Sequence, residues 1–143
     1  MSGLRGWVFA AAAGAILVAC SSGGGSPSAP FSGAPMVTAT STSGVLDVAL
    51  RLSQEPPNAG LLQGQLTITK ASDGSPVDGL TLQVTPWMPQ MKHGASVAPT
   101  VTAEGSGVYQ VNDLDLIMPG LWELKTAVSG PMTDTVNPEF QVQ

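Results

Sequence analysis

Apolar and polar side chains alternate along much of this chain, and this period of two constrains the fold more than any other feature. In residues 46–52, LDVALRL, every second side chain is Leu or Val, while Asp, Ala and Arg stand between them. Successive side chains of a β-strand point to opposite faces, so the segment predicts a strand with one buried face. Similar runs predict strands over residues 63–70, 80–85, 98–103, 108–116, 122–128 and 140–142.

Turn residues separate these seven segments, and no segment shows a convincing helical period. Asp73-Gly74 and the sequence Gly-Ser-Gly at 105–107 are examples. Seven short strands with turn signals about every ten residues are typical of a sandwich of two sheets. The sequence therefore predicts an all-β fold, a seven-stranded antiparallel immunoglobulin-like β-sandwich over residues 45–143. The single Cys allows no internal disulfide, so the core must stabilise this domain.

The first 19 residues read as a secretory signal and not as part of the fold. Arg5 precedes an apolar run over residues 7–18 that is too short to span a bilayer. The run ends in Leu17-Val18-Ala19-Cys20, which resembles the lipobox of bacterial lipoproteins. The resemblance implies cleavage before Cys20, attachment of acyl chains such as palmitate to its thiol, and acylation of the new amino terminus.

Residues 20–44 are expected to tether the domain to its lipid anchor. The segment is rich in Ser, Gly, Pro, Ala and Thr, and such a segment buries too little apolar surface to offset its ordering entropy. Several acyl chains on Cys20 would hold the mature protein at a membrane without spanning it. Ser21, where an Asp would signal retention, resembles the outer-membrane sorting pattern, so we expect the protein at the outer membrane, facing the periplasm.

The charge balance excludes one class of partner. The chain has ten Asp and Glu against five Lys and Arg, a net charge of −5. Nucleic-acid binding depends on basic side chains that neutralise phosphates, so we expect no nucleic-acid partner.

Residues 86–94, PWMPQMKHG, hold two of the six methionines, one of the three tryptophans and the only histidine. Thioether sulfur suits Cu(I) and imidazole suits copper and zinc, so Met88, Met91 and His93 are candidate copper ligands. The prolines after Thr85 and Met88 favour an extended or polyproline II backbone, whose three residues per turn would return Met88 and Met91 to one side. The alternative is that these methionines fill gaps in the core.

A second methionine lies in Met118-Pro119-Gly120, where Pro-Gly predicts a type II turn with a positive φ at the glycine. Loops of a sandwich gather at its two ends, so Met118 can join the other ligands if both loops share an end. Trp87 and Trp122 flank the methionines and could shield a soft ion from water. The alternative for both tryptophans is a place in the core.

Together these motifs resemble a known family. WMPQMKHG at 87–94, GVY at 107–109 and MPGLWEL at 118–124 are similar to the YtkA-like and FixH-like domains of the bacterial envelope. The resemblance implies a CopC-like immunoglobulin-type sandwich with a copper-linked binding role, in some members tied to cytochrome oxidase assembly. The chain departs from the FixH-like pattern in replacing a transmembrane anchor with a lipid. It departs from CopC-like proteins in lacking an N-terminal histidine on the mature chain, which argues against their kind of Cu(II) site.

Catalytic patterns are weak, and we expect no enzyme. One His without a Ser or Cys nucleophile gives no triad, because Cys20 is assigned to lipid. Asp113 and Asp115 lie two apart on a predicted strand and are best interpreted as a solvated face. The leading interpretation is a copper-binding envelope lipoprotein that hands copper to an envelope partner. The alternatives are a metal-free protein–protein interaction module, in which the Pro/Trp/Met loop is an apolar patch, and a lipoprotein without a ligand.

Overall fold

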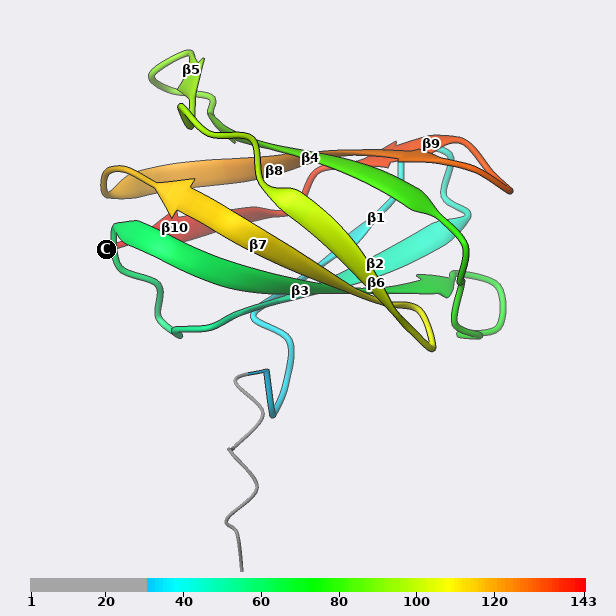
Figure 1. The fold of residues 1–143 in the computed structure, drawn as a ribbon. Helices are drawn as coiled ribbons and strands as arrows, with labels where there is room; N and C mark the ends of the chain where they lie inside the picture. Colours follow the sequence, from blue (N-terminus) through cyan, green and yellow to red (C-terminus); the bar gives the residue numbers. More distant parts are fainter. Residues whose placement is uncertain (1–30) are drawn as a thin grey trace, which may run out of the picture.

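Two antiparallel sheets face each other across one core in the computed structural model, which describes residues 31–143 (Figure 1). The predicted signal peptide, Cys20 and the first part of the predicted tether lie outside the described residues. Between residues 31 and 143 no helix is long and apolar enough to cross a bilayer.

The first sheet has the strand order β1-β2-β3-β7-β6. The second has the order β10-β8-β4-β5, with β9 also paired to β8. The first sheet comprises β1 (Val37–Thr40), β2 (Leu46–Leu52), β3 (Gly60–Lys70), β7 (Val108–Leu116) and β6 (Thr100–Gly105). The second comprises β10 (Glu139–Val142), β8 (Gly120–Ser129), β4 (Thr81–Met88), β5 (His93–Gly94) and β9 (Asp134–Val136).

The all-β antiparallel sandwich is confirmed, but the described residues form ten strands and not seven. The seven predicted strands correspond to β2, β3, β4, β6, β7, β8 and β10. The additional strands β1, β5 and β9 have two to four residues each. Segments this short have too few alternating side chains to show a period of two in the sequence. They form strands because a longer neighbouring strand offers its backbone hydrogen-bonding groups.

β1 lies in the segment assigned to the tether, so the predicted domain boundary at residue 45 is too late. Val37–Thr40 pairs with Asp47–Leu50 of β2, and the half-buried side chains of Val37 and Ala39 pack against the core. Further out, the Arg51 Nε–H donates to the carbonyl oxygen of Gly33 at 3.0 Å. The sandwich thus includes residues that composition alone assigns to a flexible linker.

The alternation in β2 predicts the core correctly. The apolar side chains of this strand are all at most 2% exposed: Leu46, Val48, Leu50 and Leu52. The other side chains of the core come from both sheets. Trp122 is the largest of the fully buried side chains.

Tyr109 fastens the segment before β4 to the first sheet. Its ring is 1% exposed, and its hydroxyl donates to the carbonyl oxygen of Val77 at 2.8 Å. The hydroxyl oxygen of Tyr109 also accepts a hydrogen bond from the Leu80 N–H at 3.2 Å. One buried hydroxyl therefore satisfies two backbone groups that would otherwise lack a partner.

Asp134 connects the turn between β1 and β2 to β9. Its carboxylate accepts hydrogen bonds from the Ser43 hydroxyl, from the Ser43 N–H at 3.2 Å and from the Thr135 N–H at 2.8 Å. The side-chain hydrogen bonds of Ser41 and Ser43 lower the pKa of Asp134 to about 2. Because β1 and β9 belong to different sheets, this carboxylate ties the two layers together at the edge.

Candidate metal centre

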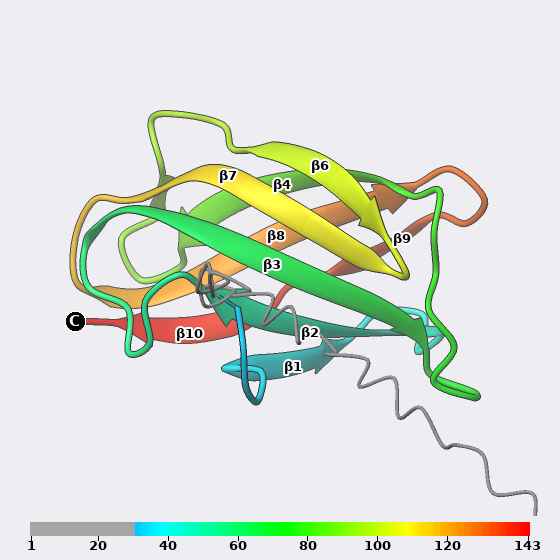
Figure 2. The ribbon, with the colours of Figure 1, turned by 60° about the horizontal axis from the view of Figure 1, so that its bottom comes forward.

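One end of the sandwich gathers both methionine-bearing loops. The turn between β4 and β5, the turn between β7 and β8, and the C-terminus all lie there (Figures 1 and 2). The strand registers agree, because Trp87 near the end of β4 pairs with Glu123 near the start of β8, and Gly120 at the start of β8 pairs with Val142. The two loops, remote in the sequence, are therefore neighbours in space.

β4 continues beyond its predicted end at Thr85 and includes Pro86, Trp87 and Met88. Pro86 is tolerated because its carbonyl oxygen accepts from Ala95 on the β5 side, at 3.3 Å. The N and O of one strand residue point to the same side, so the missing N–H of Pro86 also faces this edge and leaves the pairing with β8 intact. Trp87 and Met88 thus belong to a strand, as the extended backbone expectation requires.

The polyproline II expectation is wrong for residues 89–92. These residues form a tight turn closed by a hydrogen bond from the Lys92 N–H to the Met88 carbonyl oxygen at 2.9 Å, with Lys92 at a φ of 54°. The pairing of β5 with β4 outweighs the local preference of the prolines. Met88 and His93 become direct partners across the two strands. Partners of this kind project to the same face, so the register places a thioether and an imidazole side by side.

Gly94 is required for this register. A Cβ at Gly94 would lie 2.6 Å from the Pro86 carbonyl oxygen and 3.4 Å from Cε3 of Trp87. Only a glycine lets β5 approach β4 closely enough to hold His93 opposite Met88.

Met88 reaches from β4 to the turn between β7 and β8. Its side chain is 3% exposed, and a Cβ at Gly120 would lie 2.8 Å from its terminal methyl group. Gly120 has the positive φ predicted for this turn, +136°, although it already begins β8. The core interpretation of Met88 is therefore correct as far as packing is concerned, and its thioether also borders the loop that carries Met118.

Met118 is half-buried and packs against the core. Its carbonyl oxygen accepts a hydrogen bond of 2.9 Å from Nε1 of Trp122. Trp122, predicted as an aromatic shield, is instead a fully buried core residue. Its hydrogen bond fixes the backbone of the Met118 turn from the side of the core.

The two other predicted residues point outward. Met91 lies in the turn and is 57% exposed. Trp87 is half-buried on the outer face of β4, opposite to the face of Met88, with the Lys125 ammonium 4.4 Å from its ring centroid. Trp87 therefore does not shield Met88, because adjacent residues of a strand leave opposite faces.

His93 is half-buried, and its Nδ1 lies 3.3 Å from the Gly94 carbonyl oxygen. A proton on Nδ1 in this contact leaves the lone pair of Nε2 for a ligand. Within residues 31–143 no group of three or more His, Cys, Asp or Glu side chains could hold a metal ion. The donors at this end are thus one imidazole and the thioethers of Met88, Met91 and Met118, a set that fits a soft monovalent copper ion.

Comparison with known proteins identifies the family. A family model described as YtkA-like matches residues 40–127, well over half of the chain. The chain belongs to the YtkA-like family. The match spans both methionine-bearing loops and begins inside β1. No curated protein matches the chain, and no solved structure matches it.

The sequence predicted the positive φ of Gly120 but not its close approach to Met88, and it gave no structural role to Gly94. Gly94 and Gly120 carry no donor atom, yet each marks a close approach between elements. The signal was present, since both directly follow or end a segment that holds a candidate ligand.

Proposed function

We propose that this YtkA-like protein is anchored by lipid on Cys20 to the bacterial outer membrane, faces the periplasm and binds Cu(I). Met88, Met91, His93 and Met118 supply the ligands. The protein holds copper for an envelope partner, such as an oxidase assembly system, and its role is binding and not catalysis.

The observation that carries this proposal is the pairing of Met88 with His93 beside the Met118 turn. A graded set of donors results: Met88 is buried, Met118 and His93 are half-buried, and Met91 is exposed. Exposed and buried soft donors at one surface suit an ion that enters from solution and leaves again to a partner. The family resemblance, with its copper-linked members, points in the same direction.

A competition titration tests the proposal. The full chain with Cys20→Ser, purified in detergent, is titrated with Cu(I) under reducing conditions against a chromophoric chelator. The substitution is needed because the Cys20 thiol of any molecule that has not been lipidated would itself bind Cu(I). We expect competition at micromolar chelator, and its loss when Met88→Leu, Met91→Leu and His93→Ala are combined.

Leu is chosen at position 88 because it conserves volume in the core, so that lost binding does not reflect lost folding. The matched control is Met132→Leu, which removes a half-buried thioether next to a different hollow. No competition by the parent chain, or unchanged affinity in the triple variant, would remove the proposal.

A second candidate is a metal-free protein–protein interaction module. It is favoured by exposed apolar side chains at the same end, with Leu61 68%, Met91 57% and Ile117 43% exposed. Grouped apolar surface commonly marks a partner site. This candidate predicts that replacing Trp87 abolishes association with a partner while His93→Ala leaves it unchanged.

A further inference from the structure

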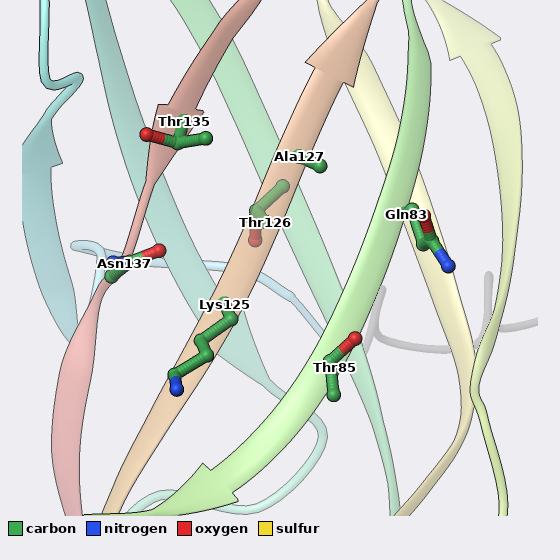
Figure 3. A pocket seen from close by; sticks show the side chains of 7 residues that line it. All are labelled: Gln83, Thr85, Lys125, Thr126, Ala127, Thr135 and Asn137. Carbon is green, nitrogen blue, oxygen red and sulfur yellow. The ribbon is translucent and has the colours of Figure 1, made fainter.

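The outer face of the second sheet carries a hollow on the strands β4, β8 and β9. Gln83 of β4 and Thr135 of β9 are both register partners of Ala127 on β8. In the adjacent row Thr85 pairs with Lys125, and Asn137 directly follows β9. The side chain of Ala127 is shorter than those around it and forms the floor of the hollow (Figure 3). The hollow has a volume of about 440 Å³.

The hydroxyls of Thr126 and Thr135 are bonded within the fold, whereas four other polar side chains around this floor are not. Within residues 31–143 the side chains of Gln83, Thr85, Lys125 and Asn137 make no hydrogen bond to protein. The two amides and the Thr85 hydroxyl can each donate and accept. Such groups complement the hydroxyls of a polyhydroxylated molecule, which also both donate and accept.

Among residues 31–143, Lys125 is the one charged residue that lines the hollow, in a chain whose net charge is −5. Its ammonium rests over the Trp87 ring, at 4.4 Å from the centroid. Glu123 and Glu139, which pair with each other, occupy the next row beyond Lys125 on the side away from Ala127. The ammonium points away from Ala127, toward the row of Trp87 and Glu123 (Figure 3), and an acid group placed over Ala127 would draw it back toward the hollow.

Size narrows the class of ligand. A volume of about 440 Å³ exceeds what an inorganic anion fills and falls in the range of sites for small organic molecules. We propose that this hollow binds an acidic sugar, a monosaccharide-sized polyol whose carboxylate meets Lys125 and whose hydroxyls meet Gln83, Thr85 and Asn137. The site is separate from the methionine-rich end and does not depend on copper.

Calorimetric titration of the copper-free full chain in detergent with glucuronate tests the site, with glucose and inorganic phosphate as comparison probes. We expect saturable binding of glucuronate, accompanied by a change in tryptophan emission as the Lys125 ammonium leaves the Trp87 ring. Lys125→Met should weaken glucuronate roughly tenfold, the usual effect of losing a charged hydrogen bond, and should leave glucose unchanged.

The matched pair Ala127→Val and Ala49→Val separates the hollow from general effects. Both positions lie on outer faces of strands, and Val favours strands, so both variants should fold as the parent does. Ala127→Val fills the floor and should abolish glucuronate binding, whereas Ala49→Val should not. The proposal is overturned by absent binding at millimolar glucuronate, by equal binding of glucose or phosphate, or by undiminished binding in Ala127→Val.

Discussion

Gly94→Ala tests the geometry of the methionine-rich end without removing a donor atom. The new Cβ would start 2.6 Å from the Pro86 carbonyl oxygen, and side-chain carbons essentially never come closer than 3.0 Å to such an atom. β5 must therefore move away from β4 by at least 0.4 Å, the difference between these two distances. The Ala95 N–H to Pro86 O separation, 3.3 Å in the native chain, would grow to about 3.7 Å, which is too long for a hydrogen bond.

The expected cost to global stability is small, because β5 pairs through only two residues and can detach alone. A lost backbone hydrogen bond contributes about 0.5–1.5 kcal/mol. The expected effect on the Cu(I) affinity is larger than the effect on global stability. A detached His93 must be ordered again on binding, at about 1–2 kcal/mol for one residue, which corresponds to roughly tenfold weaker Cu(I) binding.

Two measurements check this reasoning. Amide hydrogen exchange at Ala95 should lose its protection in the variant, and the Cu(I) competition titration should report the weaker affinity. Gly105→Ala is the control, because Gly105 ends β6 at the hairpin with β7, far from the methionines, and has a φ of +85°, so this change strains the fold elsewhere. Unaltered protection at Ala95 would refute the steric argument. Lost protection with unaltered affinity would show that the position of His93 does not matter for copper.

Two further predictions concern the fold itself. Tyr109→Phe leaves the Val77 carbonyl and the Leu80 N–H without their buried partner, so urea unfolding should show a loss of roughly 2–4 kcal/mol; a loss below about 1 kcal/mol would contradict the role given to this hydroxyl. Asp134 has a folded-state pKa of about 2, below the ordinary 3.8, so its hydrogen bonds contribute stability above that ordinary value and lose it as the pH falls through about 2. Between about pH 5 and about pH 2, the melting temperature of the parent should therefore fall more steeply with decreasing pH than that of Asp134→Asn. Equal slopes would disprove the assignment.

The strands that are long and alternating could be predicted from the sequence. The boundaries of β2 and β7 coincide with the predicted segments 46–52 and 108–116. In β2 every second side chain is buried, whereas in β7 a register irregularity between Val111 and Leu114 is needed to turn the apolar side chains on both sides of it to the core. The strand order and the short strands β1, β5 and β9 could not be predicted, since they depend on which edge a neighbour offers. The local preference of Pro89 for an extended backbone also failed, because pairing between β4 and β5 imposes a turn there.

The members of the candidate site were chosen by residue chemistry and stay a prediction, and their orientations could not be predicted from the sequence. Residue chemistry identified Met88, Met91, His93 and Met118, and the topology of a sandwich explains why two loops can meet at one end. The face of the sheet to which each side chain points could be assigned only once the strand register was known. Once β4 is known to run through Met88, alternation alone places Trp87 on the outer face, where it contacts Lys125.

Met88 belongs both to the core and to the proposed donor set, and this double membership has a consequence for the evolution of the family. A substitution to leucine there would preserve volume and hydrophobicity, so the chain would still be made, folded and kept by the cell. Only the sulfur would be gone. If Met88 binds copper as proposed, loss of binding through this position would leave protein abundance unchanged. A relative with leucine at the corresponding position would then fold normally and lack one soft ligand.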